Sequence, residues 1–303
     1  MGHHHHNHNH DHHHSGEDGL SLAFWLNLIF SVIEGIGGIM TNSTAILADA
    51  FHDFMDAVAI GIAVLIEKIS GRRRSPGFSY GYKRFSLMAS LGMAIFLLVG
   101  SLVMATGAIR SFIAPAEVDG AGMIWLALLG LAVNGFAFLR IKSGNGHNQN
   151  KKAIMLHLLE DVLGWAAVLV GAIVISFTGW FWVDGLLALA IAVFIGYNAI
   201  RNMTETLRIL LQAVPHDVDM DRLTKELMNI RGVSNIHDLH AWSLDGEHHV
   251  GTLHAVVKAE YLMDRDSVRS AIGELMKTHH ISYSTVQIEG LSNCCIPPAY
   301  PRQ

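Results

Sequence analysis

Six apolar segments dominate the first two thirds of this 303-residue chain and constrain its fold more than any other feature. Each has close to the roughly 20 residues that a helix needs to cross the hydrocarbon of a bilayer. Because backbone polar groups in lipid must be satisfied within the segment, we expect a bundle of six transmembrane helices. The segments cover residues 20–41, 44–69, 86–113, 121–139, 153–178 and 180–200.

The composition supports a membrane domain joined to a polar one. The chain is 51% hydrophobic, and the apolar residues are clustered in these segments. The net charge of -5 is small, and no basic stripe of the kind that binds nucleic acid is present. Cys294 and Cys295 are adjacent, so no disulfide framework is expected and a reducing, cytosolic location is the simpler interpretation. The polar start of the chain predicts no cleavable signal peptide.

Composition changes at both ends of the apolar region. Residues 1–19 contain nine histidines between positions 3 and 14 and have no apolar cluster to bury. We expect a disordered, metal-catching tail there, with an affinity tag as the alternative. Residues 20–210 are the predicted transmembrane domain, and residues 211–303 are predicted to form a small cytoplasmic α+β domain. Its expected helix-strand-strand-helix-strand order falls at residues 219–230, 234–244, 249–257, 264–278 and 282–288.

Positive charge predicts the orientation in the membrane. Lys and Arg follow the second, fourth and sixth apolar segments, whereas the loops near residue 42, at 114–120 and near 179 contain none. The positive-inside rule therefore places both termini in the cytoplasm. We expect a multi-pass protein of the cell inner (plasma) membrane.

Ionisable side chains inside two apolar segments mark the candidate functional site. His52 and Asp56 are four residues apart and share one helix face, and the same spacing returns at His157 and Asp161. Such residues are costly in a membrane and by default mark an ion pathway. Two imidazole nitrogens and two carboxylates form the tetrahedral set that zinc prefers. The alternative is that they are helix–helix contacts, but two pairs with identical spacing favour a metal site.

The ligand choice in the first of these segments is open from the residues alone. Asp49 and Asp53 are also four residues apart and lie within the same stretch. The matching pair in the fifth segment favours His52 with Asp56. Asp49 and Asp53 are then supporting or helix-packing groups.

Two further acids lie within the predicted spans. Glu34 is in the first segment, and Asp184 is near the non-cytoplasmic end of the last. Each is expected either to line an aqueous path or to pair with a polar neighbour such as Asn27 or Asn134.

The predicted cytoplasmic domain is rich in histidine. His237 and His240 are three apart in a predicted strand, so we expect them on opposite faces. His254 on the next strand can meet His237 across the ladder, and Glu289 with the two cysteines can complete a second metal site. The alternative is a scatter of exposed histidines that bind no metal. The remaining members of the set are His248, His249, His279 and His280.

Taken together, six residue patterns resemble the cation diffusion facilitator family, on its bacterial-type zinc exporter branch. The patterns are Val32-Ile33-Glu34 with Gly37-Gly38, Ala45 to Ala50 leading to His52 and Asp56, Tyr80 to Arg84, His157 to Asp161, Ile236 to Ser243 and Thr285 to Glu289. The resemblance implies a homodimer of six-helix subunits with cytoplasmic ferredoxin-like domains. It also implies a transport site of His52, Asp56, His157 and Asp161 that exchanges zinc for protons, and metal binding at His237 and His254.

The chain departs from the family pattern at three places. Tyr82 replaces a histidine that often follows Phe-Gly, so no extra metal site is expected in that loop. Ser86 replaces a common glutamate. Tyr283 or Ser282 stands where a histidine commonly opens the last strand, so His279 or His280 would have to replace that ligand.

The ligands themselves suggest how metal and proton flows are coupled. Only neutral histidine binds metal, and its reference pKa of about 6.5 lies just below cytoplasmic pH. A site open to the cytoplasm takes Zn²⁺, and a site open to a more acidic space gains protons and releases it. The alternatives are a membrane metal sensor and a membrane metalloenzyme. The enzyme is disfavoured because His-Glu-x-x-His is absent and four protein ligands leave no open position.

Overall fold

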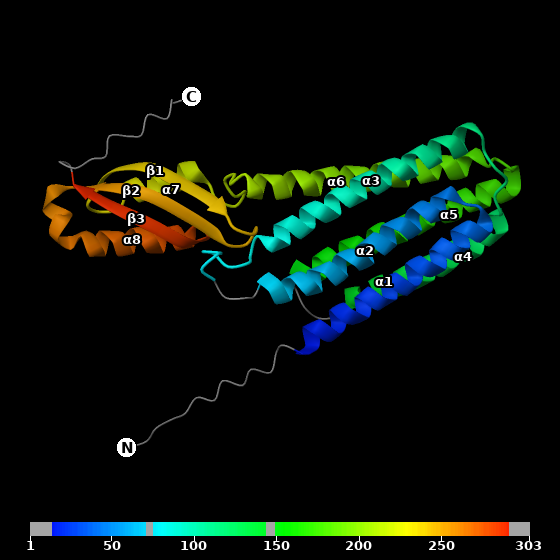
Figure 1. Ribbon diagram of the computed structural model, residues 1–303, viewed down its shortest axis with the longest axis horizontal. Helices are drawn as coiled ribbons and strands as arrows, with labels where there is room; N and C mark the ends of the chain where they lie inside the picture. Colours follow the sequence, from blue (N-terminus) through cyan, green and yellow to red (C-terminus); the bar gives the residue numbers. More distant parts are fainter. Residues whose placement is uncertain (1–13, 71–74, 144–148, 291–303) are drawn as a thin grey trace, which may run out of the picture. The chain divides into compact units, whose positions relative to one another are not determined.

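The computed structural model describes residues 14–70, 75–143 and 149–290, which belong to two compact units. One unit comprises residues 1–68 and 92–202, and the other comprises residues 69–91 and 203–303. The first unit is helical, whereas the second contains the three-stranded sheet and its helices (Figure 1).

In the described residues, six long helices occupy the places of the six predicted segments, in the predicted order. They are α1 (His14–Thr41), α2 (Thr44–Ser70), α3 (Phe85–Ile113), α4 (Gly120–Ser143), α5 (Gln149–Thr178) and α6 (Trp182–Leu210). In the described part of the chain, α3, α4, α5 and α6 each contain a stretch long and apolar enough to cross a membrane, and α1 contains a shorter apolar stretch. Helix α2 is 27 residues long but carries Asp49, Asp53 and Asp56 in its first half. Helix α6 continues beyond the predicted end at residue 200.

Small residues let these helices approach one another closely. A Cβ atom added at Gly185 of α6 would lie 2.5 Å from the backbone nitrogen of Phe112 on α3. On α4, a Cβ at Gly130 would lie 2.3 Å from the Trp165 ring of α5. Trp165 in turn belongs to the buried cluster that contains Ile46 of α2. Such contacts are typical of membrane helices, whose association depends on close packing rather than on the hydrophobic effect.

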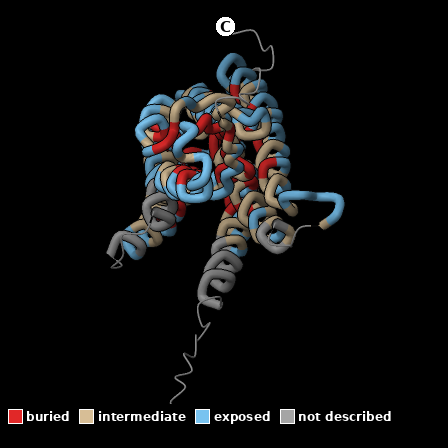
Figure 2. The backbone as a smooth tube through the Cα atoms, turned by 90° about the vertical axis from the view of Figure 1, so that its left-hand side faces the viewer, coloured by how far each residue is buried: buried red, intermediate tan, exposed pale blue. Residues whose placement is uncertain are grey.

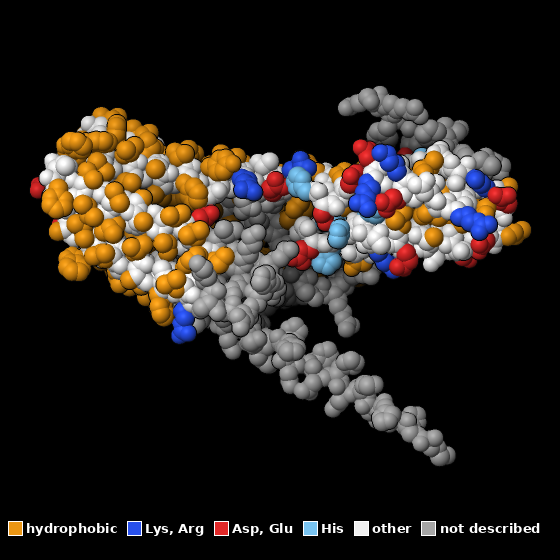
Figure 3. Space-filling model, turned by 180° about the vertical axis from the view of Figure 1, so that it is seen from behind, with side chains coloured by type: hydrophobic (Ala, Val, Ile, Leu, Met, Phe, Trp, Pro, Cys, Tyr) orange, Lys and Arg blue, Asp and Glu red, His pale blue; other side chains and the backbone are white. Residues whose placement is uncertain are grey.

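The surface of the helical unit is apolar. Hydrophobic side chains cover its visible face in Figure 3, and Phe177, Trp125 and Ile113 are among the large exposed ones. An apolar surface of this extent is unfavourable in water and is expected to face lipid. Lys, Arg, Asp and Glu are instead common on the visible face of the other unit (Figure 3).

The second unit has the predicted α+β order. It contains α7 (Met220–Met228), β1 (Val233–Ser243), β2 (His249–Val257), the 3₁₀ helix η1 (Ala259–Asp264), α8 (Arg265–Thr278) and β3 (Ile281–Gly290). The described residues form one sheet of order β1-β2-β3, in which β2 is antiparallel to β1 and parallel to β3. Helix α7 begins at Asp219, whose carboxylate accepts a hydrogen bond from the Arg222 backbone nitrogen as an N-cap.

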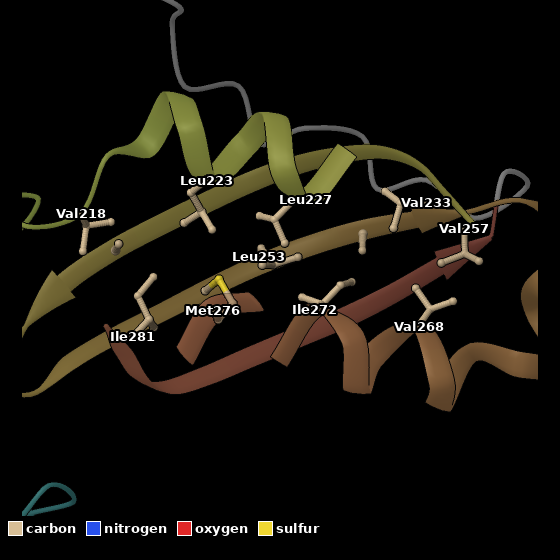
Figure 4. Packing of buried hydrophobic residues seen from close by; sticks show 12 residues of the cluster. Val218, Leu223, Leu227, Val233, Leu253, Val257, Val268, Ile272, Met276 and Ile281 are labelled. Atoms are coloured by element: carbon tan, nitrogen blue, oxygen red, sulfur yellow. The ribbon is translucent and has the colours of Figure 1, made fainter. Parts of the chain in front are cut away.

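The core of this unit lies between the two helices and one face of the sheet. Leu223 and Leu227 are one turn apart on α7 and point toward Ile272 and Met276 of α8 and Leu253 of β2 (Figure 4). All five side chains are fully buried, and in Figure 2 the buried segments lie inside the exposed ones. Side chains alternate along a strand, so the neighbours of Leu253 point to the opposite face of the sheet. His254, which directly follows Leu253, and its cross-strand partner His237 therefore lie on that second face.

Candidate metal centres

Helix α2 brings one predicted ligand pair together in the helical unit. The Nε2 atom of His52 lies 3.7 Å from a carboxylate oxygen of Asp56, one turn further along the helix. Both side chains are partly exposed, at 21% and 24%. Toward the start of α2, Ala45, Ile46 and Ala48 are completely buried. The pair is therefore accessible, while the turns before it are packed.

Helix α5, which carries the second predicted pair, packs against α2. The carboxylate of Asp49 lies 4.0 Å from the position that a Cβ atom would occupy at Gly164. Asp161 is one turn before Gly164 and so lies on the same side of α5. His157 belongs to α5 one turn earlier, but its side chain lies outside the described part of the structure.

Acidic side chains from three helices converge beside this contact. Glu34 of α1 is 1% exposed. Its electrostatic interactions with charged groups are with Asp53, Asp49 and Asp161. Asp49 and Asp53 also interact electrostatically with Asp161 and Asp56. Several carboxylates in a low-dielectric interior repel one another unless cations or protons neutralise them. This acidic cluster is therefore suited to hold cations.

Asp184 has a different setting. Its carboxylate accepts hydrogen bonds from the Ser43 hydroxyl and from the backbone nitrogens of Thr44 and Ala45, at the start of α2. The expectation of a polar partner is confirmed, but the suggested partners Asn27 and Asn134 were wrong. A side chain 141 residues away in sequence is what reaches it.

The sheet of the second unit brings together all three predicted cytoplasmic ligands. His237 and His254 are cross-strand partners, with ring centroids 5.0 Å apart. The buried Glu289 carboxylate lies 3.2 Å from His237 Nε2 and 2.7 Å from His254 Nδ1. It also accepts a hydrogen bond from Gln287. An acid that contacts both rings fixes their orientation, as carboxylates do for metal-binding histidines.

A bulge in β1 adds a residue that the sequence reasoning missed. The register changes between His237 and His240, which pair with His254 and Thr252, two residues apart on β2. His237 and His240 therefore face the same side, and the prediction of opposite faces was wrong because the bulge adds one residue. The extra residue Asp238 has a positive φ of 49°. With His237 and His254 it forms a group whose ligand atoms lie within 4.8 Å of one another.

Several other histidines of this unit pair with carboxylates. His279 Nε2 lies 2.9 Å from Glu226, and hydrogen bonds from Arg222 and then His279 lower the pKa of that carboxyl below its usual value. His279 therefore contacts Glu226 of α7 and not the group of His237, His254 and Glu289. His248 and His249 contact Asp245 and Asp217 respectively. Cys294 and Cys295, which were predicted to contribute to the second site, lie outside the described residues.

Apolar helices that bury carboxylates beside an imidazole, joined to a polar α+β unit, define a membrane protein that handles cations. The chain belongs to the cation efflux, or cation diffusion facilitator, family of transporters and is not an enzyme. Residues 20–211 match the family model for the cation efflux transmembrane domain, and residues 215–291 match the model for the cytoplasmic domain of cation efflux proteins. It is a multi-pass membrane protein, and its C-terminal domain is cytoplasmic.

Curated relatives are similar over nearly the whole chain. The zinc transporter ZitB of Yersinia pseudotuberculosis is 36% identical over 289 residues, which cover 93% of this chain and 92% of the relative. The metal cation efflux system protein CzcD of Cupriavidus metallidurans is 32% identical, covering 90% and 86%. A cadmium, cobalt and zinc/H(+)-K(+) antiporter of Bacillus subtilis is 29% identical, covering 89% and 88%.

Proposed function

We propose that this protein exports Zn²⁺ from the cytoplasm in exchange for protons, with His52, Asp56, His157 and Asp161 as the transport site. The observation that carries the proposal is the pair of His-x-x-x-Asp motifs on α2 and α5, two helices in contact. Two nitrogens and two carboxylates suit tetrahedral zinc and leave no open position for catalysis. Relatives named as zinc transporters and as a metal/H(+)-K(+) antiporter support the same substrate and coupling.

Competition between metal and proton for the same lone pairs couples their flows. Neutral imidazole and ionised carboxylate bind Zn²⁺, and their protonated forms do not. In the less acidic cytoplasm fewer protons compete for these groups, so the site loads with metal. When the site faces a more acidic compartment, it takes up protons and releases the metal ion. The neighbouring acids Glu34, Asp49 and Asp53 lower the energy of any cation in the site, which helps an ion with two charges to enter a low-dielectric region.

Transport then requires that the site be exposed to the two sides in turn. We place α2 and α5, which carry the ligands, in the moving part of the bundle. The protein works in the inner (plasma) membrane as a homodimer, with both termini in the cytoplasm. The histidine-rich residues 3–14 hold zinc near the cytoplasmic entrance without taking part in the transport step.

Zinc uptake into sealed proteoliposomes tests this proposal. With an acidic interior and an outward-facing cytoplasmic domain, purified protein should accumulate Zn²⁺ inside and make the interior more alkaline. Collapsing the pH gradient with a protonophore should stop net accumulation. Metal binding without uptake would favour the sensor, the remaining alternative, over the exporter.

The second proposed metal site, in the cytoplasmic domain, consists of His237, His254 and Glu289. The short contacts of Glu289 with both rings support it, and Asp238 is an additional donor within reach. Zinc bound there stabilises the folded domain, because a ligand that binds only the folded state shifts the equilibrium toward it.

Substitution of Glu289 tests the cytoplasmic site. In a background that lacks residues 3–14 and in which His52→Ala weakens the transport site, Glu289→Gln should reduce the remaining zinc affinity about tenfold or more, because the rings lose their orienting carboxylate. Isothermal titration of the full-length protein measures the effect. The exposed Glu274→Gln is the matched control and should change nothing. Equal zinc affinity in both variants would remove Glu289 from the site.

A further inference from the structure

The start of α2 is held by a side chain from another helix. Asp184 is the third residue of α6 and is completely buried. One of its oxygens lies 2.5 Å from the Ser43 hydroxyl and 3.3 Å from the Ala45 nitrogen, and the other lies 2.7 Å from the Thr44 nitrogen. The Ser43 oxygen accepts in turn from the Ile46 nitrogen. Free donors at a helix start are thus satisfied by one network.

The charge of Asp184 suits this position. The N-terminus of a helix carries a partial positive charge, and hydrogen bonds from its amides to an ionised carboxylate are stronger than neutral ones. Because the site excludes water, loss of the carboxylate would leave buried donors unsatisfied. The network is therefore a strong link between α2 and α6.

Small side chains beside the network bring three helices close together. Ala45 of α2, Ala108 of α3 and Ala188 of α6 form one fully buried cluster. In the turn between α1 and α2, the Asn42 side chain donates to the Glu117 carbonyl in the α3–α4 loop. The beginning of α2 is thus bonded or packed on several sides.

A second capping carboxylate shows what is unusual about Asp184. Asp119 accepts hydrogen bonds from the backbone nitrogens of Ala121 and Gly122, at the start of its own helix α4. That cap acts within one chain segment. Asp184 caps a helix 140 residues earlier in the sequence, so it also fixes where two helices stand relative to each other.

We propose that Asp184 is a positioning residue that fastens the non-cytoplasmic end of α2 to α6. That end is non-cytoplasmic because the opposite end of α6 leads into the cytoplasmic domain. His52 lies nine residues after Ser43, about 14 Å along the helix axis. The link therefore sets the depth and rotation of the transport-site pair, and α2 moves as a lever about this fixed end. Only the consequence for transport rests on the proposed zinc/proton exchange.

This role excludes the pathway role for Asp184. Its two oxygens are occupied by three donors, and the side chain has no contact with solvent. A proton carrier has to exchange its proton with water or with another carrier. A permanent cap of a helix N-terminus instead keeps its hydrogen bonds throughout the cycle.

Two variants and a matched control test the link. Asp184→Asn turns an amide N–H group toward backbone donors, and Ser43→Ala removes the bridging hydroxyl without changing any titratable group. Asp119→Asn alters the same kind of cap within one helix, where Asn is as good a cap as Asp. Amide hydrogen exchange of Thr44 to Ile46 in the full-length protein, without metal, reports the link directly. Zinc flux against pH reports its consequence.

The expected results separate the link from a proton-carrying role. Exchange at Thr44 to Ile46 should become about tenfold faster or more in Asp184→Asn and should increase less in Ser43→Ala, with no change in Asp119→Asn. Maximal zinc flux should fall about tenfold or more in Asp184→Asn and partly in Ser43→Ala, while the midpoint of the pH profile stays the same. The two substitutions should be non-additive, because they break one network.

The proposal is overturned by unchanged exchange in both variants, or by a shifted pH midpoint in Asp184→Asn with normal flux in Ser43→Ala. If Asp184→Asn does not fold, the exchange and flux of Ser43→Ala decide. A wild-type protein that moves no zinc would refute the proposed function alone, because the exchange measurement needs no transport.

Discussion

Asp161→Asn is expected to reduce zinc flux about a hundredfold or more while leaving a folded protein in the membrane. The substitution keeps the shape of the side chain and removes its charge. In the proposed site, three ligands would remain for an ion that needs four. Asp161 also belongs to one electrostatic cluster with Glu34, Asp49 and Asp53. The substitution removes one negative charge from this cluster, so any cation held there is less stabilised.

Proteoliposome flux at saturating zinc, together with the zinc affinity of the detergent-solubilised protein, measures the effect. Glu160→Gln is the matched control, because Glu160 is the neighbouring acid on α5 and is exposed. That variant should transport normally. Wild-type flux in Asp161→Asn would remove Asp161 from the transport site, whereas equal losses in both variants would indicate a general effect of charge on α5.

The helices and strands could be predicted because their signals are local. Membrane helices need apolar stretches of a certain length, and all six segments matched observed helices. In the cytoplasmic domain, the predicted strand 249–257 has the observed bounds of β2, because alternating and β-branched residues mark it. Asp219, predicted as the acidic start of a helix, is the N-cap of α7.

Partners distant in the sequence could not be predicted. Nothing near Asp184 indicates that it bonds to Ser43, since the two residues meet only when α2 and α6 pack. The bulge at Asp238 did leave a local signal. Ile236 and Leu239 both pack against the core, three residues apart, and Ala241 follows two residues later. A strict alternation would not give that spacing, so the pattern itself indicates an extra residue.

The His279 contact shows a different limit. Its position before the last strand made it a replacement for the histidine that the family commonly has there. In the structure it lies against Glu226 of α7. The packing of α7 against α8 brings Glu226 to His279. Composition alone cannot distinguish this contact from a position in the metal site.

Selectivity is expected to depend on His52. His52→Asp should retain zinc transport and increase the preference for Cd²⁺ relative to Zn²⁺ about tenfold. The altered site has one nitrogen and three carboxylates, each able to bind through two oxygens. It therefore accepts a larger ion and a less regular geometry, whereas two imidazoles favour tetrahedral zinc. Flux should also depend less on pH, because one of the two imidazoles that can bind either a metal ion or a proton is gone.

Competition in proteoliposomes, with zinc flux measured against increasing cadmium, compares the two proteins directly. His216→Asp is the control, since His216 is exposed and contacts Glu205 rather than the transport site. Helix spacing is retained in His52→Asp, so a change in preference reports the ligand itself. The parent protein should reject Mg²⁺ and Ca²⁺, because they need six or more oxygens and two of its four ligands are imidazole nitrogens. An unchanged preference between zinc and cadmium would place selectivity outside His52, in the buried carboxylates Asp49 and Asp53 or in the packing of α2 against α5.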